Sequence, residues 1–221
     1  MATDIAIFSI VETRLKLLLV ERREAPLGWA LPGGFLRPHE TLDECARREL
    51  LEETNVAAPV LAQFANFSAP ERDPRGWTLS VAYLALLPFD GISPQGGSDA
   101  ARAEWFDAES LPPLAFDHAE IAAAALNGLR ARLKDLGILF ALLPQRFTVA
   151  QLQAMWETVA GQPADRRNFH SWVMKTGRLR ETNEVARGSH RPARLYERAE
   201  DEGRAIHEGK HARLPAPRSP R

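Results

Sequence analysis

The first two thirds of the chain alternate short apolar runs with polar or Pro/Gly interruptions, a pattern typical of β-strands. Two other segments predict helices. Thr41–Asn55 opens with a capping box of Thr41 and Glu44, and His118–Lys134 is rich in alanine and leucine. Strands with helices on both sides predict an α/β (α+β) sandwich. The runs that predict strands are Ile5–Val11, Leu15–Val20, Trp29–Leu31, Thr78–Leu87 and Glu104–Phe106.

A second pattern begins after the apolar segment Leu136–Pro144, which we interpret as a short connector. Thr148 is a candidate cap for an amphipathic helix to Thr158, and Gly161-Gln-Pro interrupts it. Asp165 can cap a second helix, which Gly177 can end in left-handed geometry. Two further runs, Leu179–Glu184 and Ala193–Tyr196, can pair as a hairpin around Gly188.

Helix, break, helix and hairpin together outline a winged helix-turn-helix. We therefore expect a first domain at residues 1–140, a winged helix-turn-helix domain at 141–198 and a disordered tail at 199–221. The tail has almost no apolar residues, several prolines and mixed charges.

Composition limits the kind of protein. With 45% hydrophobic residues the chain can bury a core, and a single cysteine, Cys45, excludes an internal disulfide framework. No apolar run approaches the roughly 20 residues that cross a bilayer. We expect a soluble, cytoplasmic protein with no membrane partner.

Charge is distributed unevenly along the chain. Residues 145–221 hold 15 Lys and Arg against 9 Asp and Glu, a net +6, while the first 144 residues carry a net −7. A basic C-terminal part suits a polyanion such as nucleic acid. A basic solvated surface without a partner remains an alternative.

Three glutamates on the first predicted helix carry the clearest chemistry. Glu49, Glu52 and Glu53 stand at i, i+3 and i+4, so they share one helix face, and Leu42, Cys45 and Ala46 extend that face. Carboxylates clustered beside an apolar stripe repel one another unless a cation compensates them, and oxygen ligands suit Mg²⁺ or Mn²⁺. The alternative is a solvated face paired with Arg47 and Arg48.

The spacing of these residues resembles the Nudix box: Gly, five residues, Glu, seven residues, Arg-Glu, a bulky aliphatic, any residue, Glu-Glu, any residue, Gly, aliphatic. Asn55 stands where the family has glycine, and asparagine tolerates left-handed backbone geometry, so we expect little catalytic harm. The matching residues are Gly34, Glu40, Arg48, Glu49, Leu50, Glu52, Glu53 and Val56.

The resemblance implies a function for each of these residues. Glu49, Glu52 and Glu53 would bind the metal, with one of them as a possible general base, and the Gly34 carbonyl would be a further ligand. Arg48 would orient the acids as part of the catalytic set. Glu40 would stabilise the loop. The residues themselves predict that Gly33 and Gly34, after Pro32, form the sharp turn into the box, and an ordinary turn explains the pair equally well. The implied reaction is metal-assisted hydrolysis of a diphosphate.

The rest of the first domain resembles the branch of Nudix proteins that handles ADP-ribose, through Trp29-Ala-Leu-Pro-Gly-Gly, the loop 71–76 and the segment 115–118. We expect ADP-ribose or a related nucleotide as ligand. The candidate substrate-binding residues are Trp29, Arg72, Arg75, Phe116 and His118. The alternatives are a solvated polar turn for the loop, core positions for the aromatic residues and a helix cap for His118.

The second predicted helix of the C-terminal part presents a polar, basic face, and the hairpin adds arginines. Direct DNA readout by a winged helix-turn-helix requires such a face and such a wing. The candidate DNA-binding residues are Arg166, Arg167, Asn168, His170 and Lys175 on the helix and Arg187, Arg191 and Arg194 on the wing.

The order of the two domains resembles the Nudix-related transcriptional regulators of bacterial NAD metabolism, over about residues 4–197. That family implies a homodimer that binds double-stranded operator DNA and releases it when ADP-ribose occupies the Nudix domain. Many of its members have degenerate boxes, whereas this chain keeps every box carboxylate. We therefore expect an ADP-ribose-responsive regulator that can also hydrolyse its ligand. The alternative is a metal-dependent ADP-ribose pyrophosphatase whose C-terminal domain serves only dimerisation.

Overall fold

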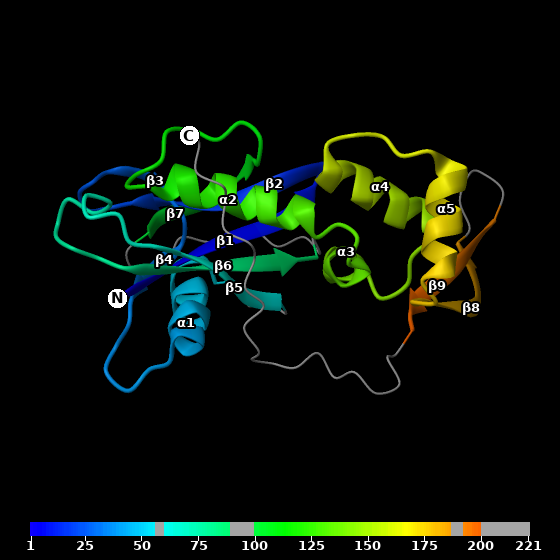
Figure 1. Ribbon diagram of the computed structural model, residues 1–221, viewed down its shortest axis with the longest axis horizontal. Helices are drawn as coiled ribbons and strands as arrows, with labels where there is room; N and C mark the ends of the chain where they lie inside the picture. The colour runs from blue at the N-terminus through cyan, green and yellow to red at the C-terminus, as the bar shows by residue number, and fades with distance from the viewer. Residues whose placement is uncertain (56–59, 89–99, 187–191, 200–221) are drawn as a thin grey trace, which may run out of the picture.

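The computed structural model describes residues 1–55, 60–88, 100–186 and 192–199. A curved sheet lies between helices at one end of the molecule, and a small helical and hairpin unit forms the other end (Figure 1). The elements are β1 (Ala2–Val11), β2 (Arg14–Arg22), β3 (Gly28–Ala30), β4 (Gly33–Phe35), α1 (Leu42–Thr54), β5 (Val60–Phe67), β6 (Ser80–Leu87), β7 (Ala100–Asp107), α2 (His118–Ala131), α3 (Leu136–Leu142), α4 (Val149–Ala160), α5 (Arg166–Lys175), β8 (Leu179–Ala186) and β9 (Ala193–Arg198).

The large sheet is mixed. Its main order is β3-β2-β1-β6-β5, with β4 paired to β1 and β7 paired to β2. The neighbours β1 and β6 run parallel, with Ile5 opposite Tyr83, and the other pairs are antiparallel. Alternate residues of β1 therefore face opposite sides of the sheet, as the period of a strand requires.

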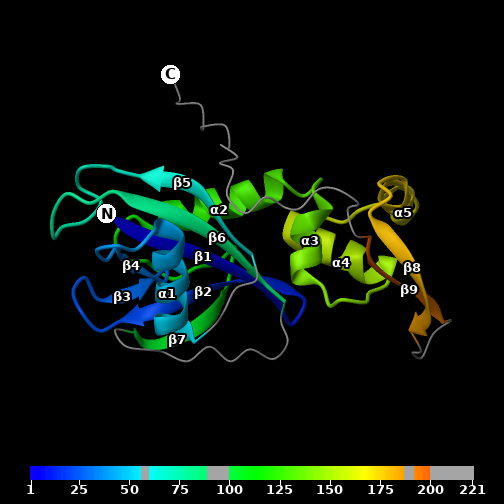
Figure 2. The same ribbon diagram turned by 90° about the horizontal axis from the view of Figure 1, so that it is seen from below.

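Helices cover both faces of this sheet. On one face Ile5 and Ile7 of β1 pack with Ala46 and Leu50 of α1. On the other face Phe8 belongs to a second cluster that includes the buried side of α2. Figures 1 and 2 show the sheet between the two helices. The predicted sandwich of strands and helices is confirmed.

The second cluster continues beyond the sheet into the C-terminal unit. It joins Phe8 and Leu129 of α2 to Leu139 of α3, Leu152 of α4 and Val173 of α5 without a break. Both views place α3 and α4 between the sheet and α5 (Figures 1 and 2). The segment that we interpreted as a connector is thus a buried helix, with Asp135 as its N-cap, and the expected boundary after residue 140 falls within it.

The C-terminal unit has the predicted outline. Thr148 caps α4 through a capping box, Gly161 ends it in left-handed geometry, and Asp165 accepts a hydrogen bond from the Asn168 amide at the start of α5. The strands β8 and β9 pair antiparallel. A backbone bridge between Phe147 and Tyr196 ties this hairpin to the entry of α4.

Other details of the first domain differ from the expectations. Gly33 and Gly34, expected to form a turn, lie in β4 and pair with β1, and strand β5 was not predicted. Asn55 does adopt the expected left-handed conformation, with φ 55° and ψ 30°. The expected tail beyond Ala199 lies outside the described residues.

Within the described ranges, no helix combines the length and the apolar character needed to span a membrane.

Candidate functional site

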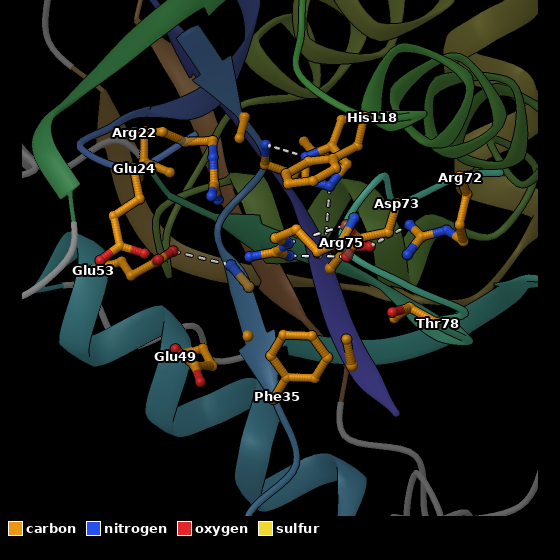
Figure 3. Close-up of a pocket in the computed structure, with 18 of the residues that line it drawn as sticks. Arg22, Glu24, Phe35, Glu49, Glu53, Arg72, Asp73, Arg75, Thr78 and His118 are labelled. Atoms are coloured by element: carbon orange, nitrogen blue, oxygen red, sulfur yellow. Dashed lines mark hydrogen bonds and ion pairs between the residues drawn. The ribbon is translucent and has the colours of Figure 1, made fainter. Parts of the chain in front are cut away.

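A cavity opens at the edge of the sheet where β1, the end of β2, β4 and the first turn of α2 meet α1 and the loop between β5 and β6. Figure 3 shows its side chains. Carboxylates from α1 form one wall, and arginines from the end of β2 and from the 69–79 loop form adjoining walls. The cavity therefore gathers both signs of charge in one concave space.

The acidic wall consists of Glu49 and Glu53. Glu53 accepts a hydrogen bond of 2.9 Å from the Gly33 amide, which ties the helix to β4. Gly34 lies so close to Glu49 that a Cβ atom at position 34 would collide with its carboxylate. Burial raises the pKa of Glu49 despite its contact with Arg48. These two glutamates line the cavity, as the shared helix face predicts.

Glu52, the third predicted ligand, has a different environment. Its carboxylate accepts hydrogen bonds from both terminal nitrogens of Arg37, at 3.3 and 3.1 Å, and one from Arg48 at 3.3 Å. It does not line the cavity. Among the described residues, no three His, Cys, Asp or Glu side chains converge as a ready metal site.

Arg48 organises the residues around the acidic wall. Its guanidinium donates to Glu40 at 2.6 and 2.9 Å and to Glu49 at 2.5 Å. The Arg48 hydrogen bonds, together with one from the Arg37 amide, lower the pKa of Glu40 to about 2. The predicted behaviour of Glu40 and Arg48, loop support and orientation of an acid, agrees with these contacts.

The basic wall is built around the ring of Phe116, whose backbone has a positive φ of 56°. The guanidinium carbon of Arg22 lies 4.8 Å from the ring centroid and that of Arg75 lies 5.0 Å from it. Hydrogen bonds to Asp73 raise the pKa of Arg75. Burial and the nearby charge of Arg75 lower the pKa of Arg22. The charge of Arg75 is thus neutralised by a carboxylate in direct contact, whereas the hydrogen-bond partner of Arg22 is a neutral carbonyl.

Arg72 belongs to a buried ionic network at the rear of the cavity. Its guanidinium makes a bidentate pair with Asp117, at 2.8 and 2.7 Å, and a further bond of 3.0 Å to Asp4. The Leu31 amide donates to His118 Nδ1 at 2.9 Å, so the ring proton is assigned to Nε2, which faces Asp4. Both residues line the cavity with protein partners already in place.

Two functional candidates differ from the sequence prediction. Trp29 does not line the cavity, because its ring packs edge-on against Phe106 at 4.6 Å and carries Arg102 at 4.9 Å. Arg22 does line it, although we did not predict this. Arg22 lies at the end of an ordinary strand pattern, and no local motif marks a position that becomes important only through the distant Phe116.

The residues of α5 that we predicted to bind DNA lie on an exposed face of the helix. Phe169 and Val173 are buried in the same cluster as Leu152 of α4, whereas the polar residues of α5 are exposed. The residues left exposed are Arg166, Arg167, Asn168, His170 and Lys175. On the hairpin, Arg194 is exposed and forms an ion pair with Glu181. Arg187 and Arg191 lie outside the described residues.

Two protein-family models match separate parts of the chain. The NUDIX domain family matches residues 2–125, and the NrtR DNA-binding winged helix domain family matches residues 139–197. The ADPR responsive transcriptional repressor NtrR of Acinetobacter baylyi is 35% identical over 202 residues, which cover 89% of this chain and 80% of that protein. The chain belongs to the NrtR family of Nudix proteins.

A solved NrtR structure is similar over both domains. Shewanella oneidensis NrtR, crystallised with a 27mer DNA, gives a TM-score of 0.76 at 30% identity, over 90% of this chain and 93% of the other. The Nudix domain of the same NrtR, solved with ADP ribose, gives 0.54 at 33% identity, over 58% and 86%. An ADP-ribose pyrophosphatase of Methanocaldococcus jannaschii is 40% identical over 119 residues, 53% of this chain and 69% of that enzyme.

Proposed function

We propose that this chain is a transcriptional regulator that responds to ADP-ribose and that its Nudix domain also hydrolyses ADP-ribose or a related nucleoside diphosphate derivative. The observation that carries the proposal is the cavity itself. It combines the box carboxylates Glu49 and Glu53 with Arg22 and Arg75, in a chain that also carries an exposed basic recognition helix. The relatives that respond to ADP-ribose, bind DNA or hydrolyse ADP-ribose support it.

The acidic wall fits a divalent metal by the chemistry of its donors. Glu49 and Glu53 offer hard carboxylate oxygens, Gly34 leaves room for close approach, and Glu52 follows Glu49 by three residues at the margin of the same helix face. We propose these residues as ligands of Mg²⁺ or Mn²⁺. Such an ion would neutralise phosphoryl charge and lower the pKa of a bound water.

The other residues of the cavity bind and orient. Arg22 and Arg75 can donate charge-assisted hydrogen bonds to the diphosphate oxygens, and Phe116 offers an aromatic face between them. Arg48 holds Glu49 in place through its own contact with Glu40. Arg72 pairs with Asp4 and Asp117 at the rear of the cavity and so holds the first turn of α2 when no ligand engages it.

The C-terminal domain is proposed to bind operator DNA. We propose that the exposed side chains of α5 enter the major groove and that Arg194 of the hairpin contacts the phosphate backbone as part of a wing. A winged helix reads one half-site, so a homodimer on a palindromic operator is proposed for the whole protein.

The hydrolase half is tested by turnover of ADP-ribose with Mg²⁺, comparing the native chain with Glu53→Gln. The variant is expected to lose roughly 100-fold or more of the rate, because a carboxylate that binds metal or accepts a proton is removed. Glu12→Gln, an exposed glutamate in the β1–β2 turn, is the matched control and is expected to keep the native rate. Equal rates in all three proteins would contradict a metal-dependent box.

The regulatory half is tested by a gel shift on the DNA upstream of the gene. The shift is expected to reverse with ADP-ribose, and Arg167→Gln is expected to weaken it and to reduce the salt slope by about one. Arg14→Gln, whose exposed side chain pairs with Asp107 in the first domain, is the control. Turnover with no shift on any candidate operator would leave an enzyme whose C-terminal domain only dimerises.

A further inference from the structure

One arginine of the Nudix domain holds the end of a helix in the DNA-binding domain. Arg130, in the last turn of α2, donates from Nε to the Val159 carbonyl of α4 at 3.0 Å, and its guanidinium pairs with Glu109. The helix α4 ends one residue later, and Gly161 follows with a φ of 70°. A Cβ atom at Gly161 would lie 3.0 Å from the Arg130 guanidinium, so the contact is close.

The position of this guanidinium suits the end of a helix. The last carbonyls of a helix lack intrahelical donors and carry the negative end of its dipole. Arg130 satisfies one of them from outside the winged helix domain, and Glu109 balances its charge on the Nudix side. A second contact crosses nearby, from Thr158 Oγ1 of α4 to the Thr13 carbonyl at 3.4 Å.

The opposite end of α2 belongs to the ligand cavity. Asp117, the residue before the helix, uses its carboxylate to hold Arg72 and makes no cap hydrogen bond of its own. His118, the first helical residue, lines the cavity and accepts from the Leu31 amide. One helix of 14 residues therefore runs from the cavity to the end of α4. Figure 1 shows α2 extending along the sheet toward α4.

This helix can transmit a displacement. Its buried side, which includes Ile121, Ala125 and Leu129, belongs to the core cluster that continues into α4 and α5. A packed helix moves as a unit, because its neighbours interlock and its backbone hydrogen bonds are internal. A change in how its first turn is held in the cavity then alters the angle at which α4, and with it α5, is presented.

We propose that Arg130 is a positioning residue that fixes the winged helix domain on α2, and that α2 couples occupation of the cavity to operator binding. The trigger is competition for Arg72: an anionic ligand that draws on its guanidinium weakens the hold on Asp117 and so releases the first turn of α2. The inference rests on the proposed function for its ligand and its DNA.

The test compares Arg130→Gln with Arg132→Gln in the full chain. Arg132 is two residues further along and forms no side-chain hydrogen bond or ion pair with the residues that the structure describes. Operator affinity is measured with and without α,β-methylene ADP-ribose, which resists hydrolysis, and calorimetry gives the affinity of that ligand alone.

In the native chain and in Arg132→Gln the ligand is expected to weaken operator binding about 5- to 150-fold, the usual range of allosteric coupling. In Arg130→Gln that ratio is expected to fall below about 2-fold while the affinity for the ligand alone stays native. Linkage requires that operator DNA then also loses its effect on ligand affinity. Arg130→Lys keeps the positive charge at the end of α4 and is expected to retain part of the ratio of operator affinities without and with ligand. A variant that is merely misfolded would retain none of that ratio.

A native ratio in Arg130→Gln would overturn the proposal. A second measurement separates this failure from failure of the proposed function. Spin labels at Glu104→Cys on β7 and Met174→Cys on α5, both exposed while Cys45 is buried, report the distance between the domains without ligand or DNA. A distribution broadened by Arg130→Gln supports the positioning residue even if the native chain ignores ADP-ribose; an unchanged distribution overturns it.

Discussion

Two arginines reach the same phenyl ring in the cavity, and their charges are balanced differently. Arg75 is neutralised by a bidentate pair with Asp73, at 3.0 and 2.9 Å, which raises its pKa. Arg22 donates its Nε to the Pro26 carbonyl, and burial beside Arg75 lowers its pKa. An anion that enters the cavity therefore gains most from Arg22, because that charge is the less compensated of the two.

Replacing Arg22 with glutamine is expected to weaken ADP-ribose binding about 10- to 150-fold. A hydrogen bond to a charged group contributes about 1.5–3 kcal/mol, and each 1.4 kcal/mol is tenfold in affinity. Isothermal titration calorimetry with α,β-methylene ADP-ribose measures the change. Arg14→Gln, whose exposed side chain pairs with Asp107 away from the cavity, is the control. Equal affinities for the two variants would contradict a binding function for Arg22.

The same residues show how far the site could be predicted. Glu49 and Glu53 followed from helix spacing, because i and i+4 positions share a face whatever the tertiary fold. Glu52 lies at the margin of that face, and Arg37 draws it outward from a loop whose course the spacing does not determine. Arg22 and Trp29 depend on which side of β2 and β3 meets Phe116, and that is decided by strand pairing across the whole domain.

At the scale of elements, the helix that is proposed to read DNA depends on a single cap. The Asp165 side chain accepts a hydrogen bond of 2.8 Å from the Asn168 amide, and the first turn of α5 contains no other acid. Two arginines follow the cap directly, next to the positive end of the helix dipole. Asp165 thus offsets a local excess of positive charge as well as an unpaired amide.

Asp165→Ala is expected to lower the free energy of unfolding by about 1 kcal/mol, the usual cost of removing an N-cap side chain. Asp165→Asn keeps an oxygen acceptor at the cap and is expected to lose much less. Urea unfolding followed by circular dichroism measures both. A loss in Asp165→Asn as large as that in Asp165→Ala would show that the charge, and not the cap, stabilises α5.

Physical reasons explain why the sequence pattern did not predict β5, β4 and α3. In β5 the register shifts between Gln63 and Ala65, which breaks the alternation of apolar and polar residues that marks a strand. The strand β4 is three residues long and contains two glycines, so it exists through pairing with β1 and has no propensity of its own. The short apolar run that forms α3 fits a strand, a connector or a helix equally well.

At the scale of the whole molecule, the Nudix domain and the winged helix domain share one hydrophobic core. Leu152 of α4 is fully buried in the cluster that also contains Phe8 of the sheet and Leu129 of α2. Cutting the chain between its domains would expose this surface on both pieces. The two domains match different family models, but they share one core and we expect them to unfold together.

Leu152→Ala is therefore expected to destabilise the whole chain by about 2–5 kcal/mol, the usual cost of a buried leucine truncation. Differential scanning calorimetry is expected to show a single transition that moves to lower temperature. Leu27→Ala, at a side chain that is 72% exposed, is the matched control and is expected to leave the transition in place. Two separate transitions, only one of them shifted, would contradict a shared core.

The close approach of Gly34 to Glu49 separates two properties of the cavity. Any side chain at position 34 displaces the Glu49 carboxylate, yet Arg22, Arg75 and Phe116 lie on other walls and keep their places. A single substitution at Gly34 would therefore disturb the proposed metal-binding wall and leave the residues proposed for recognition unchanged.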